Sequence, residues 1–151
     1  MIADEPTTAL DVTLQGQIME LLASIRAELG SAMIMITHDL GLVAQYCQRV
    51  YVMYAGRIVE EGDIFSIFAA PKHPYTRLLL RSSLRSDRRS DEFHAIPGHP
   101  PSLRTLPSGC RFHPRCDEAI EICSRSEPAL DRKSTRLNSS HVSESRMPSS
   151  A

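Results

Sequence analysis

Two adjacent carboxylates and one histidine are the residues of this sequence best placed to do chemistry. Asp4 and Glu5 come directly after the short apolar run 1–3, and His38 follows the apolar run 31–37. If both runs are neighbouring strands of a parallel sheet, the three side chains converge at the edge where open α/β folds bind ligands. Adjacent carboxylates repel, so a cation or a shared proton is expected between them. One interpretation is a Mg²⁺ ion held through Asp4, with Glu5 orienting or deprotonating a water. The alternative is a solvated loop, with His38 merely next to a helix N-cap.

Three cysteines form a second candidate site. Cys110, Cys116 and Cys123 follow a C-x5-C-x6-C spacing, with His113 between the first two. Thiolates in a short proline-rich segment with little core of its own suggest a metal that holds the fold. Three cysteines and the histidine could bind Zn²⁺, and three cysteines with a fourth from elsewhere could hold an iron–sulfur cluster. The alternative is three unligated small apolar side chains. Cys47 lies on a predicted helix and is expected to pack rather than to ligate.

The elements that must position these groups can be predicted from periodicity. Apolar residues recur at steps of three and four over residues 14–29, which indicates a helix with one buried stripe that ends at Gly30. The run 31–37 has no polar alternation and is typical of a strand covered on both faces. Further along the chain we expect a short helix at 40–47, a hairpin of strands 49–54 and 57–62, and helices at 63–70 and 73–84. The order strand, helix, strand, helix, hairpin predicts an α/β architecture.

Composition changes along the second half of the chain. Residues 85–92 form a charged connector, and the prolines between 96 and 107 forbid regular structure. A formal net charge of −1 gives no global basic field for nucleic acid. No stretch approaches the eighteen or more apolar residues of a membrane span.

The first motif set resembles a known family. "IADEPTTALD" is similar to the Walker B strand and D-loop of ATP-binding-cassette ATPases, and "ITHDL" is similar to their switch-histidine segment. The resemblance implies that Asp4 assists Mg²⁺ coordination, that Glu5 polarises the attacking water and that His38 contacts the γ-phosphate of ATP. It also implies a D-loop that touches a partner subunit across the nucleotide, formed by Ala9, Leu10 and Asp11.

The departures from the family pattern are large. The sequence contains no G-x-x-x-x-G-K-[ST] phosphate loop, no glutamine-loop segment and no "LSGGQ"-like stretch. These motifs precede the Walker B strand in the family. We therefore expect the chain to be the C-terminal part of a longer ATPase, inactive on its own.

The second motif set resembles a narrower group. "HPYTRLLL", "IPGHPPSL", "PSGCRFHPRCDEAIEIC" and "SEPAL" are similar, in order and spacing over residues 70–130, to the C-terminal extension of oligopeptide, dipeptide and nickel ABC importer ATPases. The resemblance implies an iron–sulfur site in some members, with Cys110, Cys116 and Cys123 as three of four ligands and His113 as a weaker candidate. This sequence has no cysteine after Cys123.

The predicted organisation has four segments. Residues 1–62 are expected to be part of an ABC ATPase domain, 63–93 a helical extension with the charged connector, and 94–130 a small irregular cysteine-containing region. Residues 131–151 are serine-rich and expected to be disordered. "DRKSTRLNSSH" and "SRMPSSA" resemble a translated sequencing-library adapter, so this segment is left out of fold reasoning.

The resemblance implies a subunit that binds and hydrolyses ATP to power import of peptides or nickel. Its expected partners are a second ATPase subunit, two transmembrane permease subunits and, indirectly, an extracytoplasmic solute-binding protein, with no nucleic acid. The expected location is peripheral, on the cytoplasmic face of the membrane. The alternative function is a metal-binding or iron–sulfur regulatory module without ATPase activity, and a third possibility is that unpaired strand edges keep the isolated chain from folding stably.

Overall fold

The computed structural model describes residues 1–84, 96–128, 130–131 and 136–137. The described chain divides into two compact units, Met1–Cys47 and Gln48–Ala151. Helices and both parallel and antiparallel strand pairs occur, which confirms the predicted α/β class. The charged connector predicted at 85–92 lies outside the described residues.

The first unit is a strand–helix–strand crossover followed by a short helix. Strand β1 (Ile2–Asp4) pairs in parallel with β2 (Ile34–Ile36), and α1 (Val12–Glu28) connects them. The Asp11 carboxylate accepts a hydrogen bond from the Leu14 amide at 2.9 Å and so caps α1. Helix α2 (Leu40–Tyr46) follows β2, and Asp39 caps it in the same way. The predicted order and type of these elements are confirmed.

The predicted burial of the first unit is wrong in two places. Strand β2 was expected to be covered on both faces, yet Ile34 and Ile36 are 60% and 49% exposed. Helix α1 was expected to bury an apolar stripe, yet only Met19 is fully buried and Leu21 is 54% exposed. The physical reason is the small number of layers, since a two-stranded sheet with one crossover helix offers too little surface to cover both strand faces.

The second unit begins with an antiparallel hairpin. Strand β3 (Arg49–Tyr54) pairs with β4 (Arg57–Asp63), and a bulge lies between Val52 and Met53. The two turn residues, Ala55 and Gly56, have φ angles of 46° and 80°. Positive φ at both central positions is the requirement of a two-residue hairpin turn that matches the twist of its strands. The hairpin predicted with Gly56 in the turn is therefore confirmed.

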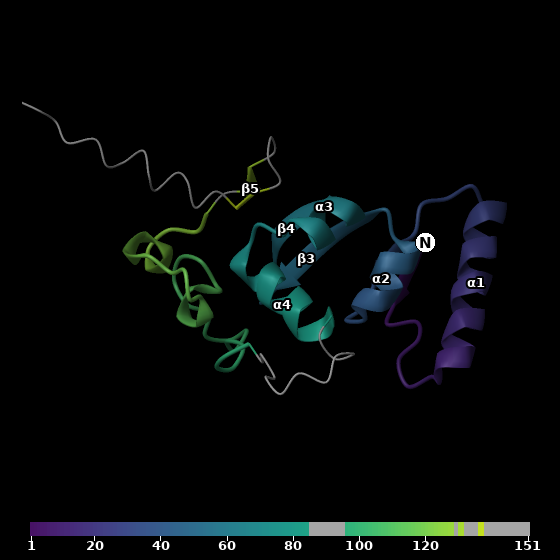
Figure 1. Ribbon diagram of the computed structural model, residues 1–151, viewed down its shortest axis with the longest axis horizontal. Helices are drawn as coiled ribbons and strands as arrows, with labels where there is room; N and C mark the ends of the chain where they lie inside the picture. The colour runs from purple at the N-terminus through teal and green to yellow at the C-terminus, as the bar shows by residue number, and fades with distance from the viewer. Residues whose placement is uncertain (85–95, 129, 132–135, 138–151) are drawn as a thin grey trace, which may run out of the picture. The chain divides into compact units, whose positions relative to one another are not determined.

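Helices α3 (Ile64–Ala69) and α4 (Pro74–Leu84) lie next to this hairpin (Figure 1). The core between them is a cluster of buried side chains, which are Val52, Tyr54, Val59, Ile67 and Phe112. Asp63 caps α3 by accepting hydrogen bonds from the amide and hydroxyl of Ser66, at 2.9 and 2.6 Å. Pro74 opens α4, where its missing amide hydrogen costs nothing. Both helices thus begin where the sequence predicts.

A buried carboxylate and a buried histidine fix the start of α4. Glu60, only 1% exposed, accepts hydrogen bonds from the amides of Lys72 and His73 at 2.7 and 3.0 Å. The Nδ1 atom of His73 accepts from the Tyr75 amide at 3.1 Å. Burial lowers the pKa of His73 to about 4, and the charge of Arg77 acts in the same direction. His73 is therefore neutral at physiological pH and serves as an acceptor.

The cysteine-containing region is irregular, as predicted, apart from two short 3₁₀ helices. These are η1 (His113–Arg115) and η2 (Glu121–Ser124). Phe112 anchors the region in the core of the second unit at 1% exposure. Its ring centroid lies 5.1 Å from that of Tyr54 and 5.4 Å from that of Tyr75. An Arg111 guanidinium also donates to the carbonyl of Ala55 in the hairpin turn.

The predicted disordered tail contains one regular feature among its described residues. Strand β5 (Leu130–Asp131) pairs antiparallel with β6 (Arg136–Leu137). The rest of that prediction falls on residues that the structure does not describe. Within the described ranges, no helix has both the length and the apolar character needed to cross a membrane.

Candidate functional site

Glu5 and His38 lie at the ends of the paired parallel strands and contact each other. Glu5 is the first residue after β1, and its amide donates to the carbonyl of Ile36 at 2.8 Å. His38 stands two residues beyond β2, and its Nδ1 atom lies 3.1 Å from Oε1 of Glu5. Their side chains are 48% and 79% exposed, respectively. The strand pairing expected from the sequence therefore places a carboxylate and an imidazole side by side in a position open to water.

The turn after Glu5 holds the same carboxylate from its other oxygen. The hydroxyl of Thr8 donates to Oε2 of Glu5 at 2.8 Å, and the Thr8 amide donates to the Glu5 carbonyl at 3.2 Å. These contacts lower the pKa of Glu5: the Thr8 hydrogen bond has the largest effect, followed by the His38 hydrogen bond. Glu5 is thus ionised at physiological pH and can accept a proton or orient a water.

Asp4 is not part of this hydrogen-bonded pair. It is the last residue of β1, opposite Ile36 in the ladder, and it is exposed. Among the described residues, no partner forms a hydrogen bond or ion pair with its carboxylate. The expected convergence of three side chains is therefore seen as a contact for Glu5 and His38 only.

The three predicted D-loop residues form the end of the turn that leads into α1, where Ala9 and Asp11 are exposed and Leu10 is half-buried. Ala9 has a φ of 64°, a left-handed conformation that non-glycine residues rarely adopt. The Leu10 amide closes the turn by donating to the Thr7 carbonyl at 3.2 Å. Asp11 serves as the N-cap of α1, a structural task that the sequence motif alone does not predict. Their role toward a partner subunit remains a prediction.

The metal site predicted at the cysteines stays a prediction, and the structure shows how these residues are held. Cys110 and Cys123 are linked through their backbones, with the Cys110 amide donating to the Cys123 carbonyl at 2.8 Å. The Nδ1 atom of His113 lies 2.8 Å from the Cys110 carbonyl oxygen. Burial raises the pKa of the Cys110 and Cys116 thiols.

In the described part of the chain no three His, Cys, Asp or Glu side chains group closely enough to hold a metal ion. We therefore derive no chemistry through an iron–sulfur cluster or zinc at these residues. Cys47 is half-buried, and burial raises the pKa of its thiol, which agrees with a packing role.

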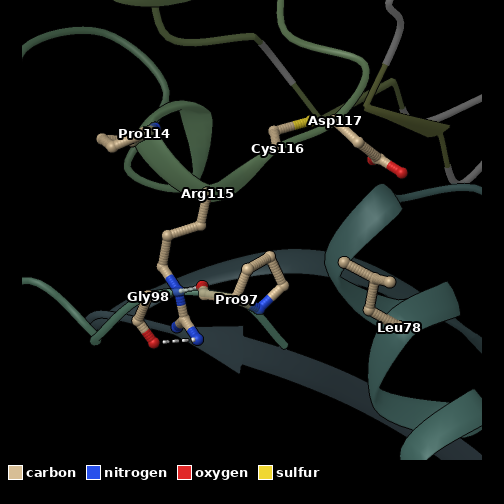
Figure 2. A pocket seen from close by; sticks show the side chains of 7 residues that line it. All are labelled: Leu78, Pro97, Gly98, Pro114, Arg115, Cys116 and Asp117. Atoms are coloured by element: carbon tan, nitrogen blue, oxygen red, sulfur yellow. Dashed lines mark hydrogen bonds between the residues drawn. The ribbon is translucent and has the colours of Figure 1, made fainter. Parts of the chain in front are cut away.

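A surface pocket of about 310 Å³ lies beside η1 and includes one of the cysteines. Its lining consists of Leu78, Pro97, Gly98, Pro114, Arg115, Cys116 and Asp117 (Figure 2). The Arg115 guanidinium reaches across it to donate to the carbonyls of Pro97 and Gly98, at 2.7 and 3.1 Å. Because those donors already satisfy protein carbonyls, the arginine organises the proline-rich segment and is not available as an anion site.

The order of elements in the first unit and the Glu5–His38 contact agree with the resemblance to ATP-binding-cassette ATPases predicted from the sequence. Residues 59–123 match the family described as oligopeptide/dipeptide transporter, C-terminal region.

Curated relatives carry the same assignment in their names. The chain is 52% identical over 136 residues to a peptide import ATP-binding protein of Brucella ovis, an alignment that covers 86% of this chain and 40% of the relative. It is 54% identical over 128 residues to the oligopeptide transport ATP-binding protein of Salmonella typhimurium, covering 85% and 38%. It is 47% identical over 131 residues to the dipeptide transport ATP-binding protein of Escherichia coli, covering 87% and 40%. The predicted resemblance is therefore confirmed.

Among solved structures, the chain matches cbiO1 of Clostridium perfringens, part of the ABC transporter complex cbiONQ, with 37% identity and a TM-score of 0.42 over 58% of this chain and 33% of that one. The chain spans about 40% of the length of the curated relatives that it matches.

Sequence reasoning missed several residues that the structure makes important. Thr8 was given no role in the sequence analysis, and its spacing of three residues from Glu5 is the signal that could have indicated a contact within a turn. Phe112 carried no motif role, although an isolated aromatic residue in an otherwise polar, cysteine-containing stretch is a signal for a buried anchor. Glu60 and His73 had no visible signal, because their contact joins residues thirteen apart.

Proposed function

We propose that this chain supplies the water-activating edge of the ATP-hydrolysis site in an ATP-binding subunit of a peptide importer. The observation that carries the proposal is the pair formed by Glu5 Oε1 and His38 Nδ1, 3.1 Å apart at the ends of two parallel strands. The named relatives support the peptide-import assignment, since their similarity extends through both units of the chain.

In this proposal Glu5 orients and polarises the attacking water. Its carboxylate is ionised, about half exposed and held at both oxygens, so it offers remaining lone pairs to a water without rotating. His38 lies on the same side, and its ring contacts the terminal phosphate while Nδ1 stays with Glu5. Both tasks suit phosphoryl transfer, which depends on positioning and charge stabilisation.

Asp4 is the residue that would hold Mg²⁺. Its exposed carboxylate has no described partner, and Mg²⁺ in nucleotide sites typically takes one or two protein carboxylates together with phosphate oxygens and waters. A single free carboxylate therefore fits, without a cluster of three ligands. When bound, Mg²⁺ neutralises phosphate charge.

The partners belong to the proposal as well. The exposed turn of Ala9, Leu10 and Asp11 would face a second ATP-binding subunit, and the pair of subunits would sit on two permease subunits at the cytoplasmic face of the membrane. A solute-binding protein would act only indirectly, and the transported substrate would be a peptide or nickel.

The test replaces the matching segment of the E. coli dipeptide transport ATP-binding protein with residues 1–128 of this chain. ATP hydrolysis by the chimera is then measured with Glu5→Gln, His38→Ala and the control Glu20→Gln, which alters an exposed carboxylate on α1. We expect Glu5→Gln to lower kcat by about 10²–10⁴-fold, the range of a lost general base, while Glu20→Gln has no effect. A chimera whose hydrolysis is unchanged by Glu5→Gln would contradict the proposal.

A further inference from the structure

The carboxylate of Glu5 is bound at each of its two oxygens by a different residue. Thr8 Oγ1 donates to Oε2 at 2.8 Å, and His38 Nδ1 lies 3.1 Å from Oε1. We propose that Thr8 is a positioning residue of the hydrolytic site, whose hydroxyl fixes the plane of the Glu5 carboxylate so that the second oxygen faces His38. This inference rests on the proposed function only in its consequence for hydrolysis, since the hydrogen bond itself belongs to the nucleotide-free chain.

The backbone makes Thr8 suited to this task. The Glu5 amide is tied to β2 through Ile36, and the Thr8 amide closes a turn back to the Glu5 carbonyl. Glu5 itself has a φ of 43°, in the left-handed region. Because both ends of the turn are held by backbone hydrogen bonds, the Thr8 hydroxyl and the Glu5 carboxylate meet with little freedom to separate.

The hydrogen bond also limits how Glu5 can present its oxygens to a water. With one lone pair on each oxygen engaged, the remaining lone pairs point to a limited set of directions, which sets where the water can sit.

A purely structural role for Thr8, as a turn former, predicts a different outcome on substitution. Thr8→Val keeps the β-branched shape and removes the hydroxyl, whereas Thr8→Ser keeps the hydroxyl. Thr13→Val is the matched control, because Thr13 is exposed on α1 and its hydroxyl binds no described residue.

The direct test is ¹³C NMR relaxation of the Glu5 side chain in the 151-residue chain, at one neutral pH and without nucleotide. We expect Thr8→Val to lower the order parameter of the Glu5 side chain, and Thr8→Ser and Thr13→Val to leave it unchanged. An order parameter that is the same in Thr8→Val and in the unsubstituted chain would overturn the proposal.

A second measurement follows the consequence for hydrolysis in the chimera described above. Thr8→Val should lower kcat by about three- to tenfold, the range of one exposed hydrogen bond, with the KM for ATP unchanged, and Thr8→Ser should restore kcat. An unchanged kcat in Thr8→Val would overturn the positioning role. Because the NMR relaxation measurement needs no nucleotide, its outcome stands apart from any failure of the chimera to hydrolyse ATP.

Discussion

Truncation of Phe112 should detach the cysteine-containing region from the hairpin. The ring is 1% exposed and contacts Tyr54, Tyr75 and His73 at centroid distances of 5.1, 5.4 and 5.8 Å. Phe112→Ala removes the buried ring and leaves a cavity that surrounding residues can fill only in part. Such truncations cost about 3–5 kcal/mol, a large part of the total stability of about 5–15 kcal/mol that a domain possesses.

The assay is urea unfolding followed by tyrosine fluorescence. The sequence has no tryptophan and four tyrosines, so the emission reports on the tyrosines, two of which touch Phe112. Phe65→Ala is the matched control, since Phe65 on α3 is 82% exposed. We expect the control to change the free energy of unfolding by less than about 0.5 kcal/mol. A loss for Phe112→Ala no greater than that of the control would refute the reasoning that this ring anchors the region.

Two further predictions concern Gly109 and His73, which lie in the same unit as Phe112. Gly109→Ala should lower the free energy of unfolding by at least about 2 kcal/mol, because a Cβ there would lie 2.4 Å from the Cys123 carbonyl oxygen and the φ of Gly109 is 66°. Gly16→Ala, in open space on α1, should instead raise it by about 0.5–1 kcal/mol. Urea unfolding measures both changes. Since burial lowers the pKa of His73 to about 4 from 6.5, neutral His73 stabilises the fold fully above about pH 6.5, and this stability is lost as the pH falls toward 4. His73→Asn should flatten that part of the pH dependence of the urea midpoint, whereas His99→Asn, at an exposed position, should not; equal slopes in both variants would contradict the assignment.

Local signals in the sequence predicted the elements well. The positions of α1, α2, the hairpin, α3 and α4 follow from side-chain spacing, from the Asp63 cap and from the Gly56 turn. These signals act over a few residues, so the sequence carries them directly.

Burial could not be predicted in the same way, because it depends on what else surrounds an element. Ile34 and Ile36 have the pattern of a doubly covered strand, and the two-stranded sheet leaves them exposed. The apolar pattern indicates how much burial a strand is suited to, and the exposure of these two residues in the structure is greater than the pattern predicts.

The candidate site was predictable to the level of the residue pair. Glu5 and His38 could be placed together because parallel strands end at one edge. The Thr8 contact and the separateness of Asp4 depend on the course of one tight turn, which spacing does not fix. The cysteine site stays a prediction, since spacing along the chain names three candidate thiols and no three metal-ligating side chains of the described residues group closely enough to hold an ion.

The short ladder between β1 and β2 has a consequence for how the subunit is assembled. Three residue pairs set the alignment of Glu5 with His38, and a slip by one position would displace one strand by about 3.3 Å and turn its side chains to the opposite face. A chain with this slipped register would keep its helices but would lose the contact between Glu5 and His38. Burial of one strand face normally fixes the register of a strand pair, and here Ile34 and Ile36 are exposed to solvent. A strand or helix that buried these isoleucines would therefore also fix the alignment of the Glu5 carboxylate with the His38 imidazole.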